Sequence, residues 1–129
     1  MESWPPGEIS AITLFVSDVA RAKSFYQEAF GLAVHFEDDE SAVFRFGGTL
    51  VNLLHETEAP ELIDPASVAP ADAGARMQLT IPVEDVDAVC EELTRRGIAL
   101  LNGPIDRPWG PRTAAFRDPD GHIWEIARH

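Results

Sequence analysis

The sequence predicts an α+β protein made of two copies of one β-α-β-β-β module. The pattern Val-x-Asp-Val occurs at positions 16–19 and again at positions 83–86. In each half, a stretch of alternating apolar residues precedes this pattern, and a helical pattern that ends at a glycine follows it, at Gly31 and at Gly97. An internal repeat of this kind determines the topology of the whole chain.

The first half of the repeat, residues 9–55, has the pattern of a strand, a helix and three further strands. Apolar residues alternate from Ile9 to Val16, which indicates a strand with one face in a core. Asp18 is suited to cap the helix and Gly31 to end it in the left-handed conformation. The helix is predicted from apolar residues at helical spacing, which are Val19, Ala22, Phe25, Tyr26, Ala29 and Phe30. Three strands are expected at 33–37, 41–46 and 49–55, separated by the acidic residues 38–40 and the glycines 47–48.

The second half, residues 76–127, repeats this order. A strand is expected at 76–83, and Asp85 is expected to cap a helix that ends at Gly97. The apolar stripe of this helix is Val86, Val89, Cys90 and Leu93. A strand at 98–101, a long loop at 103–111, and strands at 112–117 and 123–127 complete the module, with the last two joined by an Asp-Pro-Asp-Gly turn at 118–121. Residues 56–75 contain prolines and alanines without periodicity, so they are expected to form a mobile connector, or alternatively a functional lid.

The composition limits the classes of function. A length of 129 residues suits a single domain that spans 1–129. The net charge of -12 disfavours nucleic acids and anionic membranes as partners, and it favours solubility or cationic ligands. The single cysteine, Cys90, permits no intramolecular disulfide and is expected to be a buried, inert thiol. Residues 1–7 do not have the pattern of a signal peptide, and no apolar run reaches the length of a membrane span, so a cytoplasmic protein is expected.

Three segments of the chain resemble the vicinal-oxygen-chelate superfamily, which includes glyoxalase I, bleomycin-resistance proteins, fosfomycin-resistance enzymes and extradiol dioxygenases. They are residues 16–32 (VSDVARAKSFYQEAFGL), 83–98 (VEDVDAVCEELTRRGI) and 109–126 (WGPRTAAFRDPDGHIWEI), of which the last is the most specific. The resemblance implies that the two modules curl their sheets around a cleft, usually in a homodimer. It also implies that the ligand-binding residues face that cleft.

Metal-dependent members of this superfamily place one metal ligand in the first strand and one in the last strand of each module. The matching positions here are Ala11, Asn52, Gln78 and Glu125. Only Glu125 is a good ligand for a divalent ion, because alanine has no donor atom and neutral amides are poor substitutes for imidazole or carboxylate. We therefore expect no metal cofactor, with a divalent metal held by Glu125 and unusual ligands as the alternative.

The histidines are not expected to replace the missing metal ligands. The four histidines, His35, His55, His122 and His129, are expected at the surface, away from the ligand face. Without a metal, Glu125 is the candidate catalytic residue, as a general base whose pKa burial would have to raise.

Alternation through the four matching positions predicts which side chains face a ligand. They are Ala11, Thr13, Phe15, Leu50, Asn52, Leu54, Gln78, Thr80, Ile123, Glu125 and Ala127. Trp109 belongs to a glycine-containing loop that Arg112 follows, and the two residues would add an aromatic surface and a positive charge. The alternatives are that these faces merely fill a packed interior, and that Arg112 pairs with Asp118 or Asp120. Trp124 is expected in the core, and Trp4 at a dimer interface or on the surface.

Taken with the resemblance, these residues predict a protein that binds a small organic molecule without a metal, in the manner of the bleomycin-resistance proteins. A cationic or aromatic antibiotic would suit the acidic surface. The alternative is a metal-dependent lyase or dioxygenase with a degenerate ligand set around Glu125. A structural or regulatory dimer with an occluded cleft is a third possibility.

Overall fold

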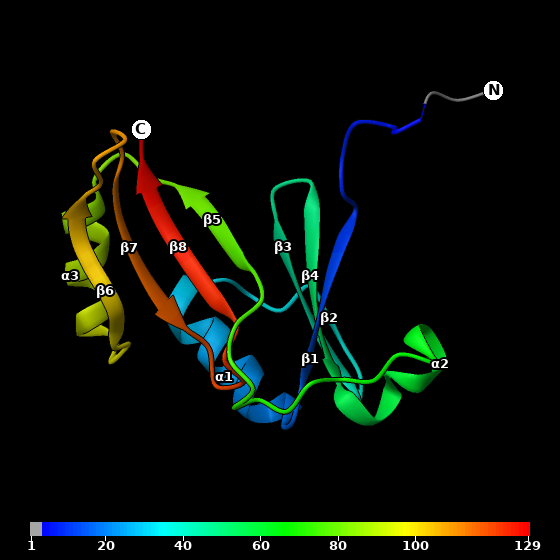
Figure 1. The fold of residues 1–129 in the computed structure, drawn as a ribbon. Coiled ribbons are helices and arrows are strands. Elements are labelled where there is room, and N and C mark those ends of the chain that lie inside the picture. Colours follow the sequence, from blue (N-terminus) through cyan, green and yellow to red (C-terminus); the bar gives the residue numbers. More distant parts are fainter. Residues whose placement is uncertain (1–3) are drawn as a thin grey trace. The chain divides into compact units, whose positions relative to one another are not determined.

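The computed structural model describes residues 4–129 and shows two four-stranded mixed sheets with three α-helices and one short 3-10 helix (Figure 1). The chain separates into two compact units, with the boundary between Ala69 and Pro70. Each unit contains one sheet, and neither sheet closes on itself. The prediction of an α+β protein with a repeated β-α-β-β-β module is therefore confirmed.

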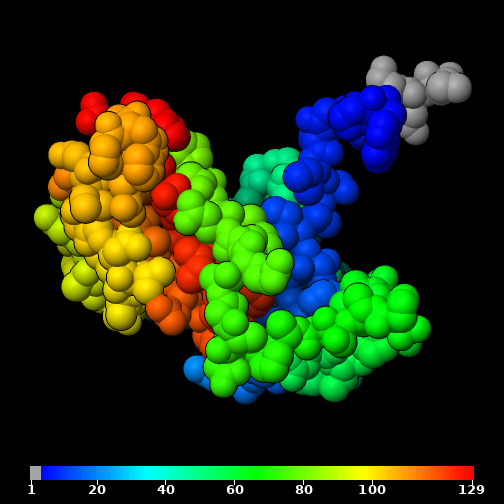
Figure 2. All heavy atoms as spheres, in the orientation of Figure 1, coloured from blue at the N-terminus to red at the C-terminus, as the bar shows by residue number. Residues whose placement is uncertain are grey.

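Unit 1 contains β1 (Ala11–Val16), α1 (Val19–Phe30), β2 (Phe36–Glu37), β3 (Ser41–Phe46) and β4 (Thr49–His55), followed by the 3-10 helix η1 (Glu56–Glu58) and α2 (Pro60–Ile63). Its sheet has the strand order β1-β4-β3-β2, with β1 parallel to β4 and the other pairs antiparallel. The residues from Trp4 to β1 project away from the rest of unit 1 (Figures 1 and 2), and Trp4 is 91% exposed.

The core of unit 1 lies between α1 and one face of its sheet. Asp18 accepts a hydrogen bond from the backbone N–H of Arg21 at the start of α1, and Gly31 ends the helix with a φ of 65°. The Tyr26 ring stacks on Phe44 of β3 with a centroid distance of 5.9 Å, and both side chains are fully buried. The predicted caps and the predicted inward face of this helix are thus confirmed.

Unit 2 contains β5 (Gln78–Pro82), α3 (Val86–Arg95), β6 (Leu100–Asp106), β7 (Arg112–Arg117) and β8 (Ile123–Arg128). Its strand order, β5-β8-β7-β6, repeats that of unit 1, again with one parallel pair, β5 and β8. The buried residues of α3 are Val86, Cys90 and Leu93, and Trp124 of β8 is 3% exposed. Asp85 caps α3 by accepting from the backbone N–H of Ala88, as predicted.

One expectation about local structure is wrong. The strand expected at 98–101 extends into the predicted loop 103–111, because β6 runs from Leu100 to Asp106 through two register shifts, and only residues 107–111 lie outside a strand. Pro104 is compatible with this strand since β6 lies at an edge of the sheet and pairs only with β7. The segment 56–75 contains η1 and α2, with Pro60 at the first helical position and Ala59 buried.

No helix within residues 4–129 is long and apolar enough to cross a membrane. The first three residues of the N-terminal segment considered for a signal peptide lie outside the described residues.

Candidate functional site

In unit 1, the predicted ligand-facing residues share the sheet face that α1 does not cover. Leu14 and Val16 of β1 are buried, whereas the alternate residues Thr13 and Phe15 are half-buried. The register pairs Ala11, Thr13 and Phe15 with Leu50, Asn52 and Leu54 of β4, respectively. The alternation therefore brings Thr13 and Asn52 side by side at the centre of this face.

The Asn52 side chain has an unsatisfied polar atom. Its Oδ1 is buried and accepts no hydrogen bond from any residue that the structure describes. A buried carbonyl oxygen without a donor costs about 1–3 kcal/mol of stability. Val43 of β3 is its register neighbour on the other side and has no side-chain donor. This oxygen is suited to accept a hydrogen bond from a ligand.

In unit 2, β5 and β8 contribute the corresponding polar residues. The register pairs Gln78 with Ile123 and Thr80 with Glu125. The Thr80 hydroxyl donates a hydrogen bond of 2.9 Å to Oε1 of Glu125. Ala115 of β7 lies on the other side of Glu125, so the carboxylate stands between a hydroxyl and a methyl group. This environment orients Glu125 and leaves it half-buried.

The donor atoms at the four metal-equivalent positions do not fit a divalent transition metal. Ala11 and Asn52 belong to unit 1 and provide a methyl group and an amide, while Gln78 and Glu125 belong to unit 2 and provide an amide and a carboxylate. Such metals prefer imidazole, thiolate or several carboxylates. Within residues 4–129, no cluster of three or more His, Cys, Asp or Glu side chains is placed to hold a metal ion.

Two of the histidines that were expected at the surface make structural contacts. His122 is half-buried, and its Nδ1 lies 2.8 Å from Oδ2 of Asp118, whose Oδ1 also accepts from the backbone N–H groups of Asp120 and His122. The buried carboxylate of Asp118 thus holds the turn before β8 together and also binds the imidazole ring of His122. His55 accepts a hydrogen bond from the backbone N–H of Thr57 and caps η1. His35 and His129 are exposed, as expected.

The tip between β6 and β7 places an arginine and a tryptophan together. The Trp109 side chain is 73% exposed, and the guanidinium of Arg107 lies 5.9 Å from the centroid of its ring. Arg107 is absent from the predicted ligand-binding set, although Trp109 of the same segment belongs to it. An arginine two residues before an exposed aromatic in a tight hairpin is the signal that would have identified it.

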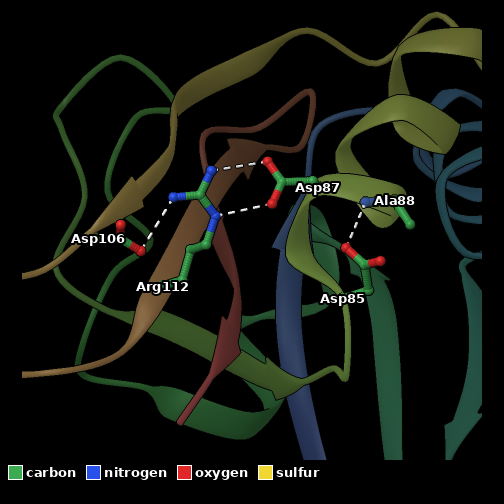
Figure 3. Close-up of polar contacts among 5 residues, drawn as sticks. All are labelled: Asp85, Asp87, Ala88, Asp106 and Arg112. Atoms are coloured by element: carbon green, nitrogen blue, oxygen red, sulfur yellow. Dashed lines mark hydrogen bonds and ion pairs between the residues drawn. The ribbon is translucent and has the colours of Figure 1, made fainter.

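Arg112 has a different role from the one expected. Its guanidinium donates to both carboxylate oxygens of Asp87, at 2.8 and 2.9 Å, and to Asp106 at 3.1 Å (Figure 3). The expected partners, Asp118 and Asp120, lie at the opposite end of β7. The two carboxylates raise the pKa of Arg112 above its ordinary value. Arg112 therefore ties the start of α3 to the ends of β6 and β7, and its contact with a ligand stays a prediction.

This tie predicts a pH dependence of stability. The hydrogen bond from Arg112 holds the pKa of Asp87 below its ordinary value of 3.8. A carboxyl group with a lowered pKa in the folded state stabilises the protein above its unfolded pKa, and this contribution is lost as the pH falls through the folded pKa. Chemical denaturation from pH 6 to about pH 3 should show that the stability advantage of the wild type over Arg112→Gln shrinks at the acidic end. The control is Arg45→Gln, which removes an exposed cation whose guanidinium donates to the Gly47 carbonyl. Parallel profiles for wild type and Arg112→Gln would contradict the assignment.

Cys90 is not suited to nucleophilic catalysis. The residue is 5% exposed, and burial, together with the charge of Asp87, raises the pKa of its thiol. A raised pKa disfavours the reactive thiolate. The expectation of a buried thiol is confirmed.

Comparison with known proteins agrees with this architecture. Residues 8–126 match the model of the Glyoxalase/Bleomycin resistance protein/Dioxygenase superfamily. A glyoxalase-related enzyme from Fulvimarina pelagi has a similar structure, with a TM-score of 0.80 and 28% identity over 95% of this chain and 88% of that chain. A member from Nocardioides is similar in fold, with a TM-score of 0.86 and 24% identity over 99% of this chain and 85% of that chain.

Similar sequences occur in bacteria. The chain is 30% identical to virulence protein STM3117 of Salmonella typhimurium, over 94% of this chain and 83% of that protein. It is 25% identical to metallothiol transferase FosB of Staphylococcus saprophyticus, over 92% of this chain and 74% of that protein. The repeated module, the strand order of both sheets and the match over residues 8–126 lead to one conclusion. This chain belongs to the Glyoxalase/Bleomycin resistance protein/Dioxygenase superfamily.

Proposed function

We propose that this chain binds a small organic molecule through the sheet faces opposite its helices, without a metal ion. The observation that carries the proposal is the buried and unsatisfied Oδ1 of Asn52. At a position where metal-dependent relatives have a metal-binding side chain, this chain has a hydrogen-bond acceptor, the Asn52 amide oxygen, that lacks a donor. A ligand hydroxyl or amino group would supply that donor and remove the cost of leaving the oxygen unpaired.

The surrounding side chains support an aromatic ligand. Thr13, Phe15 and Leu54 provide a mostly apolar surface around Asn52, which is the usual composition of a small-molecule site. In unit 2, Trp109 exposes an aromatic ring that can stack on a planar molecule. Sequestration of an antibiotic by a homodimer, with a cationic group attracted by the net charge of -12, is the most specific form of this proposal.

A second candidate is a metal-dependent enzyme whose ligand set centres on Glu125. The similarity to proteins named metallothiol transferase FosB favours it, at 24–27% identity over 92% of this chain. The donor set opposes it, because Glu125 is the only carboxylate at the four equivalent positions.

The Asn52→Leu variant tests the main proposal. Leucine has nearly the shape of asparagine but no polar atom, so it should raise the stability of the ligand-free protein by about 1 kcal/mol. The same change should reduce the thermal stabilisation produced by compounds found in a screen of aromatic and amino-substituted molecules. A variant that is less stable than the wild type without ligand, or that responds equally to every such compound, would contradict the role of Asn52.

A second comparison tests the aromatic contact. Trp109→Ala should weaken the response to aromatic compounds, whereas Trp4→Ala, which removes another exposed tryptophan, should leave it unchanged. If no compound in the screen stabilises the wild type, the proposed function is wrong.

A further inference from the structure

The tip of the β6–β7 hairpin is closed by its own backbone. The N–H of Gly110 donates to the carbonyl of Arg107 at 3.0 Å, and the N–H of Arg107 donates to the carbonyl of Pro111 at 2.8 Å. These two bonds hold residues 107–111 in a tight turn. Arg107 and Trp109 therefore project from a backbone that is already ordered, so that a ligand need not order it.

The side chain of Arg107 is oriented by neutral groups. Its Nε donates to the hydroxyl of Thr113 at 2.9 Å, and its Nη2 lies 3.4 Å from Oδ1 of Asn102. Thr113 is 2% exposed, so the contact fixes the guanidinium against the sheet. A guanidinium has five N–H donors in a planar fork, and these two contacts leave several of them available.

The contacts of Arg107 with neutral groups differ from those of the cations that form ion pairs with carboxylates. Lys23, Arg95, Arg96 and Arg112 each form an ion pair with at least one carboxylate. Within residues 4–129, Arg107 forms none, although the chain has 22 acidic residues. Its charge is therefore not neutralised by a neighbour, and it is half-buried, where water screens a charge less than at the surface.

Trp109 places an open aromatic surface beside this charge. The ring centroid lies 5.9 Å from the guanidinium carbon, within the range of a cation–π contact, and most of the indole is exposed. A planar ligand can stack on the indole while a substituent reaches the guanidinium. Carboxylate, sulfonate and phosphonate groups match the guanidinium fork with charge-assisted hydrogen bonds.

We infer that Arg107 and Trp109 form a subsite for an aromatic ligand that carries an anionic group. This inference rests on the proposed small-molecule binding and specifies the charge of one end of the ligand. The net charge of -12 does not prevent it, because salt at physiological strength screens distant exposed charges beyond about 8 Å. At contact distance, the arginine fork determines the preference.

A matched series of naphthalenes tests this subsite. The compounds are 2-naphthoate, 2-naphthamide and 2-naphthylmethylammonium, which share one ring system and differ in charge. Isothermal titration of the full chain should give a Kd for naphthoate at least about tenfold lower than for the amide, since a hydrogen bond to a charged group contributes about 1.5–3 kcal/mol. The ammonium compound should bind no more tightly than the amide.

Two variants separate the roles of the two residues. Arg107→Gln should remove the preference for naphthoate over naphthamide, whereas Trp109→Ala should weaken all three compounds and preserve their ratio. Arg45→Gln is the control, because it makes the same change in net charge at an exposed position in unit 1. Circular dichroism and thermal unfolding confirm that each variant is folded before its titration is interpreted.

The outcomes are distinguishable. A naphthoate preference that survives in Arg107→Gln, or that is also lost in Arg45→Gln, overturns the inference. So does a wild type that binds the ammonium compound most tightly. If no naphthalene binds but other compounds in the screen stabilise the protein through Asn52, the anionic subsite is wrong and the proposed function stands. If nothing stabilises the protein, the proposed function itself fails.

Discussion

Replacing Phe44 with alanine is expected to lower the free energy of unfolding by about 3–5 kcal/mol. Phe44 is fully buried in β3, and its ring stacks on Tyr26 of α1. The smaller side chain would leave a cavity between the helix and the sheet, and the lost contacts cannot be replaced in a close-packed interior. Urea denaturation monitored by circular dichroism measures this change.

Phe36 provides the matched control for this prediction. It lies in the adjacent strand β2, at the edge of the same sheet, and is 56% exposed. Phe36→Ala should cost no more than about 1 kcal/mol, because most of its surface is already in water. Equal losses in the two variants would contradict the assignment of the core of unit 1.

Gly103→Ala is expected to destabilise unit 2 by about 3 kcal/mol. A Cβ atom at this position would lie 2.5 Å from the carbonyl oxygen of Thr113 and 2.7 Å from Cα of Ala114. Both atoms belong to the backbone of β7, so the two strands would have to move apart. Since Gly103 also has a φ of 87°, the substitution adds backbone strain.

Gly47→Ala separates these two contributions. Gly47 has a φ of 60°, but nothing lies within 4 Å of a Cβ atom placed there. This variant should lose only the strain energy, about 1 kcal/mol. The Gly103→Ala variant should in addition lose the preference for anionic over neutral aromatic ligands, because displacement of β6 moves Arg107 away from Thr113. Equal stability of the two alanine variants, measured by urea denaturation, would show that β6 does not approach β7 as closely as described.

The features that could be predicted from the sequence are those set by local patterns. Alternation defined β3, β4 and β7 at the exact residues found, and an aspartate and a glycine marked both ends of α1. The extension of β6 could not be predicted in this way, because Gly103-Pro104 is typical of a loop. Only pairing with β7 at an open edge makes that sequence a strand.

The candidate site shows the same division. Strand alternation predicted that Asn52 shares a sheet face with Thr13 and that Glu125 shares one with Thr80, because side chains alternate between the two faces of a strand. The register that makes each pair direct neighbours came from the structure. The partners of long side chains could not be predicted. Arg112 reaches Asp87, which is distant in sequence, and Arg107 depends on a hairpin that the sequence did not indicate.

Metal loading tests the central claim most directly, namely that the positions used by metal-dependent relatives serve organic recognition in this chain. The purified protein and Glu125→Gln would be dialysed against Mn²⁺, Ni²⁺ and Zn²⁺, and the bound metal measured by mass spectrometry. We expect less than stoichiometric metal in the wild type and no difference in the variant, since the four equivalent positions offer only one carboxylate and two amides as donors. One equivalent of metal in the wild type, lost in Glu125→Gln, would contradict the claim and favour a metal-dependent enzyme.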